Sequence, residues 1–74
     1  MDTSDRHPGT TAVARHFAYD HLPIPLKYTS QACHDLADEM IQQLPDCPEL
    51  TAGLRKLLEA KDCFVRAALD SIRK

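Results

Sequence analysis

The side chains best suited to chemistry lie between positions 15 and 29, where aromatic rings alternate with cationic groups. They are Arg15, His16, Phe17, Tyr19, His21, Lys27, Tyr28 and Thr29. Rings stack on nucleobases, lysine neutralises phosphate, and the N–H groups at the start of a helix bind anions. Residues 1–28 contain three bases and three acids, which suits a compact phosphodiester better than a long polyanion. The alternative is that these rings simply cover the rest of the fold.

Histidine and cysteine side chains could in principle bind a metal or act as nucleophiles. The sequence has four His and three Cys, but it lacks the close ligand pairs, such as CxxC or HxxxH, that zinc sites use. Nothing in the spacing pairs a thiol with a base or sets two carboxylates in a rigid cleft. We therefore expect no metal, no cofactor and no enzymatic activity, with the thiols in the core and the imidazoles at the surface.

Length and charge restrict the classes of protein further. The 74 residues are 43% hydrophobic and 27% charged, with a net charge of −2. No apolar run reaches the roughly 18 residues that a membrane span needs, and no signal peptide is apparent. The charge does not suit duplex nucleic acid. We expect a cytoplasmic protein that binds neither membranes nor duplexes.

Hydrophobic periodicity predicts an all-α fold with one domain. We expect a flexible N-terminus over residues 1–10 and a domain over 11–74, with helices at about 11–19, 30–44 and 48–72. Pro23 and Pro25 predict a stiff connector before the second helix, which Thr29 or Ser30 would cap. The short linker at 45–48 predicts that the two long helices form an antiparallel hairpin.

The last helix is apolar around more than half of its circumference beyond Ala60. One partner helix cannot cover such a surface, so either the N-terminal segment folds over it or other subunits do. We expect a homo-oligomer. Gly53 lies within the same helix, where it costs roughly 1 kcal/mol relative to alanine. It indicates either a close approach by a neighbour or ligand, or a residue that is merely tolerated.

The hairpin contains Lys56-Leu57-Leu58-Glu59-Ala60 followed by Ala67 to Leu69, and Lys27-Tyr28, Leu36-Ala37 and Met40-Ile41 upstream. In these residues it resembles a family of small phage proteins that act as cyclic-nucleotide sponges. The similarity covers about residues 27–70. Such proteins counter CBASS and sometimes Thoeris immunity. They form compact oligomers, typically hexamers, which sequester cyclic di- and trinucleotides or cyclic ADP-ribose-type signals without cleaving them.

The resemblance also implies roles for particular residues. Lys27 and Thr29 match a Lys-x-Thr arrangement that holds phosphate near the start of the first hairpin helix. An aromatic ring of the N-terminal segment stacks on a base, and Tyr19 is the first candidate, followed by Phe17 and Tyr28. The leading hypothesis is therefore capture of a cyclic oligonucleotide at such a site.

Two other functions remain open from the sequence. The acidic first hairpin helix, with Asp35, Asp38 and Glu39, could bind a host protein, although such acids more often form a solvated outer face. A nucleic-acid-binding oligomer is the third hypothesis, and the net charge of −2 disfavours it.

Overall fold

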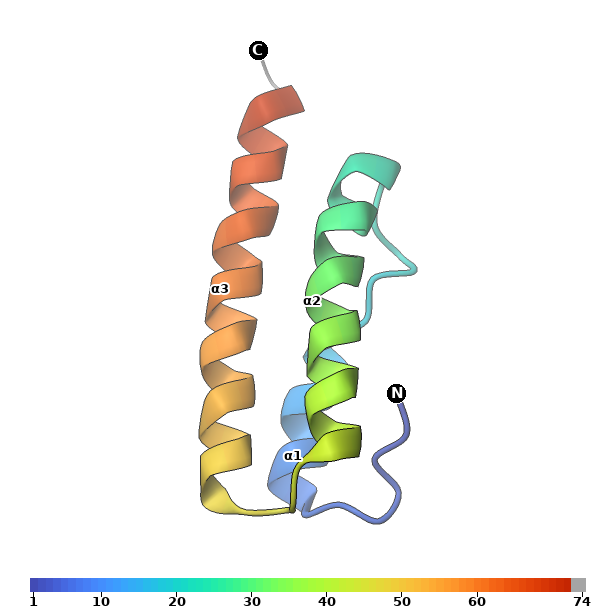
Figure 1. Cartoon of the computed structure of the whole chain (residues 1–74). Coiled ribbons are helices and arrows are strands. Elements are labelled where there is room, and N and C mark those ends of the chain that lie inside the picture. The colour runs from blue at the N-terminus through green and yellow to red at the C-terminus, as the bar shows by residue number, and fades with distance from the viewer. Residues whose placement is uncertain (73–74) are drawn as a thin grey trace.

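The regular elements in the described part of the chain are all helical, as the hydrophobic pattern predicts. The computed structural model describes residues 1–72 (Figure 1). Its elements are α1 (Pro8–Ala14), the 3₁₀ turn η1 (Arg15–Phe17), α2 (Ile24–Gln43) and α3 (Pro48–Ile72). The predicted all-α class is confirmed for this part of the chain.

The two long helices lie side by side and run in opposite directions (Figure 1). Leu44 adopts an extended conformation, as expected of a residue before proline, so α2 ends just ahead of Pro45. Pro48 begins α3, where its missing N–H removes no helical hydrogen bond. We call the end of the pair near residues 44–47 the joined end, and the end with the start of α2 and the end of α3 the open end.

Helix α2 begins at Ile24, six residues before the start that the sequence pattern indicated. Pro23 is the N-cap residue and Pro25 lies in the first turn, so both prolines belong to the helix start rather than to a connector. The first N–H groups of a helix have no intrahelical acceptor, which makes this turn tolerant of proline. Thr29 and Ser30 therefore lie inside α2 and do not cap it.

The first helix is also displaced from its expected range of 11–19. It begins at Pro8, where the Nδ1 atom of His7 accepts a hydrogen bond from the Gly9 N–H at 2.9 Å. Proline in the first turn and this side-chain cap both favour a helix start here. After Ala14 the chain tightens into η1, and no regular element continues to residue 19.

The segment expected to be flexible makes specific contacts with the joined end. The Arg6 guanidinium donates to the carbonyl oxygen of Leu44 at 2.9 Å and also to that of Ile41. The last carbonyl groups of a helix have no intrahelical donor and carry partial negative charge, so a guanidinium is a favourable partner. Thr10, at the expected end of this segment, is fully buried.

The hydrophobic core lies at the joined end, where α1 and η1 pack against both long helices. Its buried side chains are Val13, Ala14, Phe17, Cys33, Ala37, Ile41, Leu50 and Leu54. Beyond Leu54, every described residue of α3 is half-buried or exposed. At the open end, large apolar side chains remain in contact with solvent, with Ile24 65%, Tyr28 68% and Phe64 54% exposed.

Candidate functional site

A hollow of about 490 Å³ lies between the N-terminal segment and the side of α2. We call it the Tyr19 hollow. Its lining residues are Met1, Thr3, Thr11, Ala14, Arg15, Ala18, Tyr19, Asp20 and His34. Small-molecule sites in proteins typically enclose about 300–1,000 Å³, so the hollow is large enough for part of a nucleotide.

The Tyr19 ring is held in this hollow by an aromatic contact with α2. Its ring centroid lies 5.0 Å from that of His34, with an angle of 69° between the planes. This edge-to-face geometry is a favoured one for aromatic pairs. The Nδ1 atom of His34 lies 3.1 Å from the Oδ1 atom of Asp35. Tyr19 is half-buried, so part of its ring remains accessible to a ligand.

The charges at the hollow are mixed. Arg15 supplies an exposed guanidinium and Asp20 an exposed carboxylate, so the lining alone has no strong excess of positive charge. Lys27 lies on the same face of α2 as His34, because seven residues are nearly two helical turns. It is displaced along the helix by roughly 10 Å toward the open end. Lys27 is therefore a further cation on this side of the molecule.

Lys27 and Thr29 do not share a face of α2. Two residues along a helix turn the side chain through about 200°, so the two directions differ by roughly 160°. The Thr29 hydroxyl is directed to its own helix and donates to the Pro25 carbonyl oxygen at 3.4 Å. Within one chain, the Lys-x-Thr sequence is therefore not a clamp around a single phosphate.

The other aromatic candidates differ sharply in accessibility. Phe17 is fully buried at the centre of the core, so its ring cannot stack on a ligand in this conformation. Its apolar ring belongs instead to the packing of η1 against α2. Tyr28 is 68% exposed on the second turn of α2. Of the five residues expected at the site, only Tyr19 lines the hollow.

Sequence reasoning missed His34 as part of the site. The imidazoles are expected at the surface because the sequence lacks the close pairs of a metal site, and the expected helix start near Ser30 leaves Lys27 outside the helix that contains His34. If α2 is extended back to Ile24, the seven-residue spacing places Lys27 and His34 on one face. The sequence signal that could have placed His34 beside Lys27 is Pro25, because proline is tolerated in the first turn of a helix.

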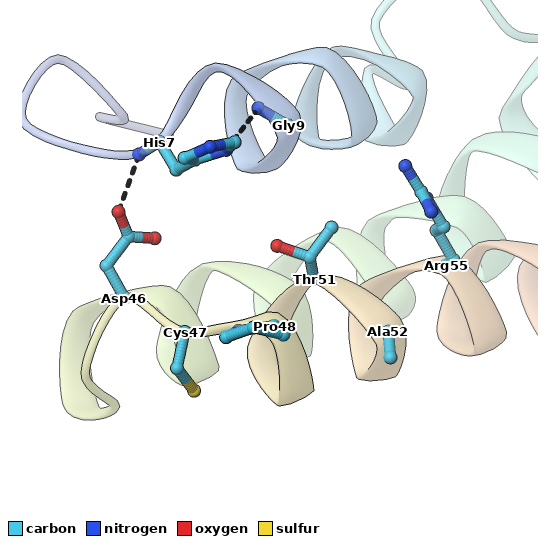
Figure 2. A pocket seen from close by; sticks show the side chains of 8 residues that line it. All are labelled: His7, Gly9, Asp46, Cys47, Pro48, Thr51, Ala52 and Arg55. Atoms are coloured by element: carbon cyan, nitrogen blue, oxygen red, sulfur yellow. Dashed lines mark hydrogen bonds between the residues drawn. The ribbon is translucent and has the colours of Figure 1, made fainter.

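A second hollow, of about 420 Å³, lies where α1 begins beside the first turns of α3 (Figure 2). Asp46 accepts hydrogen bonds there from the His7 N–H at 2.7 Å and from the Thr10 hydroxyl at 3.3 Å. The hydroxyl groups of Thr10 and Thr51 are 3.3 Å apart. Arg55 extends from α3 toward α1 (Figure 2). These polar groups mainly attach α1 to α3, so we do not take this hollow as the functional site.

Within residues 1–72, no group of three or more His, Cys, Asp or Glu side chains is placed to hold a metal ion. None of the helices in that range combines the length and apolarity needed to cross a bilayer.

Known proteins give no further guide to this site. No family model matches the chain, and neither the curated proteins nor the solved structures include a significant match.

Proposed function

We propose that this protein binds and sequesters a cyclic oligonucleotide signal without cleaving it. The observation that carries the proposal is the Tyr19 hollow, with Arg15 and His34 in its lining and Lys27 on the same side of α2. An accessible aromatic ring beside cationic groups matches the chemistry of a base and its phosphates. By resemblance to the phage sponges, the biological role is evasion of host immunity in the cytoplasm of the infected cell.

In this proposal the base stacks on Tyr19, and Arg15 and Lys27 pair with phosphate. Neither Thr29 nor Tyr28 lines the hollow, so in this proposal they contact the ligand from another copy of the chain. Self-association is therefore part of the proposed function, and the resemblance implies a hexamer. Capture is stoichiometric and reversible, with the ligand released unchanged.

Calorimetric titration against cyclic dinucleotides, cyclic trinucleotides and cyclic ADP-ribose isomers tests this function. We expect binding of at least one compound in the micromolar range or tighter. We also expect intact ligand, by mass spectrometry, after the protein is denatured. The absence of heat with every compound, at protein concentrations above 50 µM or so, would count against capture of this class of signal.

Two variants test the site. Tyr19→Ala removes the stacking platform and should weaken binding by roughly 5- to 150-fold, since a stacked base contributes about 1–3 kcal/mol. Lys27→Ala should weaken it by about tenfold or more, because hydrogen bonds to charged groups contribute about 1.5–3 kcal/mol. Arg66→Ala, which removes an exposed cation from α3, is the matched control. Equal affinities for all of these proteins would show that the ligand binds elsewhere.

The second candidate is a docking site for a host protein on α2. Asp35 and Glu39 are exposed there. The Glu39 carboxylate accepts a hydrogen bond from the Gln43 side chain at 3.0 Å. Charge reversal at Glu39 alone should weaken capture of a protein partner and leave nucleotide binding unchanged. Asp35 is kept in this test because its carboxylate lies 3.1 Å from the Nδ1 atom of His34 in the Tyr19 hollow. Unchanged capture of the partner protein together with weaker nucleotide binding would support the nucleotide hypothesis.

A further inference from the structure

The α2–α3 pair has an apolar groove that no part of α1 lines. The groove encloses about 270 Å³ and runs along residues Leu36, Met40 and Leu44 on one side and Leu50, Gly53 and Leu57 on the other. Leu36 is 46% exposed and Leu44 is 43% exposed. Figure 1 shows α1 against only one side of the pair.

Along α3, this uncovered face continues toward the open end with a seven-residue period. Gly53, Ala60 and Ala67 recur at that spacing, and the larger Leu57 and Phe64 alternate with them. A repeat of seven residues keeps the same side chains facing a second helix over many turns. A side chain added at Gly53 would have no atom within 4 Å, so the space beside this position of the helix is open.

We propose that a second copy of this chain occupies the face, with the two α3 helices antiparallel and Phe64 of each copy opposite Ala60 of the other. In this register Leu57 lies opposite Ala67, so each large side chain fills the space beside a small one. A parallel pair would instead set Phe64 against Phe64 and leave the alanines facing each other. The antiparallel pair is an isologous interface, in which one patch is complementary to itself.

Charge selects this register over its neighbour. Lys56, Cys63 and Asp70 are spaced by seven residues and form one flank of the face, and both charged side chains are exposed. With Phe64 opposite Ala60, Lys56 of each copy lies beside Asp70 of the other, which gives two symmetric ion pairs. A shift by one heptad, with Phe64 opposite Gly53, would bring Glu49 beside Asp70, and two acids repel.

This interface deepens the self-association within the proposed function, but it does not depend on the ligand. Light scattering and sedimentation measure the assembly, whereas calorimetry measures capture. A protein that assembles but binds no nucleotide would contradict the proposed function alone. A monomeric protein that binds nucleotide would overturn the interface, together with the self-association in the proposed function, and would leave nucleotide capture standing.

Charge exchange is the decisive test. We expect Lys56→Asp and Asp70→Lys each to raise the dissociation constant of the assembly by roughly three- to tenfold at low salt, since exposed ion pairs are modest. The double variant should return the constant to near that of the unchanged protein, because the same pairs reform with their signs exchanged. Failure of the double variant to restore assembly would overturn this register.

A packing variant and a cross-link provide independent readouts. Ala60→Leu fills the space meant for Phe64 and should reduce the assembled mass, whereas Glu59→Leu, one residue away, should not. In a Cys47→Ser background, a short bis-maleimide should join Cys63 of the two copies, which lie near the symmetry axis. Moving the thiol by one residue, with Asp62→Cys and Cys63→Ser, turns it through about 100° and should prevent the cross-link. Equal cross-linking of both proteins, or a monomer at all concentrations, would overturn the proposal.

Discussion

The joined end and the open end of the α2–α3 pair are built from the same two helices, yet only one of them has a core. At the joined end, α1 and η1 complete a three-sided enclosure in which Phe17 and Ile41 are fully buried. At the open end, Phe64 and Tyr28 remain more than half exposed. The amount of apolar side chain does not explain this difference, because α3 carries apolar side chains along its whole length. The presence of a third helix at the joined end explains it, because two helices cannot enclose a side chain between them on all sides.

The side-chain hydrogen bonds also differ between the joined end and the open end. At the joined end, Asp46 accepts from His7 and Thr10, and Arg6 donates to the carbonyl oxygens at the end of α2. These bonds connect segments more than 30 positions apart in the sequence. At the open end, the side-chain hydrogen bonds of α3 are local, such as that from the Ser71 hydroxyl to the Ala68 carbonyl oxygen at 2.7 Å. The joined end is thus fixed by tertiary contacts and the open end by helical ones.

The largest difference in stability should appear when a phenylalanine ring is removed at each of the two ends. Phe17→Ala should lower the free energy of unfolding by about 3–5 kcal/mol, because it leaves a cavity in the core. Phe64→Ala, measured in dilute protein, should lower it by less than about 1 kcal/mol, because the ring is mostly exposed already. Urea denaturation followed by circular dichroism measures both.

A loss of this size can unfold so small a domain, so Phe17→Leu serves as the milder companion variant. It should cost about 1 kcal/mol and keep the helical signal. If the alanine variants at positions 17 and 64 were equally unstable, the division of the chain into a packed end and an unpacked end would be wrong.

The three free cysteines provide the next test, through their rates of alkylation. Cys63 is exposed, Cys47 is half-buried and Cys33 is buried. Burial raises the pKa of the Cys33 thiol, and the positive charge of Lys61 offsets part of that rise. Since the thiolate is the reactive form, Cys63 should react first and Cys33 last, by at least about tenfold. Mass spectrometry of peptides after timed iodoacetamide treatment gives the order.

The same raised pKa has a consequence for stability. The folded state holds the Cys33 proton more tightly than the unfolded state does, so this thiol favours folding while it is protonated in both states. As the pH rises above the ordinary thiol value of 9.0, the unfolded state loses its proton first and stability falls. Cys33→Ala should remove this alkaline decline. A decline of equal size in the variant would assign it to other groups.

The smallest effect is expected at a buried hydroxyl midway along α2. Ser30 is fully buried, and its Oγ atom has no hydrogen-bond partner among the described residues. Ser30→Ala removes an unsatisfied polar group and improves helix propensity, so stability should rise by about 0.5–2 kcal/mol. Ser71→Ala, at an exposed position of α3, should change it by less than 0.5 kcal/mol or so. A marked loss of stability with Ser30→Ala would contradict this expectation and would show that the hydroxyl stabilises the fold.

The helical class and the end of α2 at Pro45 could be predicted because they follow from local chemistry. The spacing of Cys33, Ala37 and Ile41 marks one buried stripe, and proline stops the helix that precedes it. The start of α2 could not be predicted as easily. Pro25 is compatible with a connector or with a first turn, and tertiary contacts decide between them.

The site was predictable only in part, for the same reason. Tyr19 was identified from its residue type, but its partner His34 depends on where α2 begins. Phe17 and Tyr19 look alike in the sequence, and only the packing of η1 buries one ring and leaves the other beside a hollow. Burial is a property of the assembled helices, so no local pattern around Phe17 could reveal it.

The attachment of α1 has a consequence for the order in which the protein folds during synthesis. Thr10 and its contact Thr51 are separated by 41 positions, so at roughly 5–20 residues per second about 2–8 s pass between the synthesis of the two. Helix α1 has seven residues, far fewer than the roughly 12–15 that an isolated helix needs even for marginal stability. Helix α1 is therefore synthesised before the surface against which it packs, and it becomes ordered only after α2 and the first turns of α3 have provided that surface.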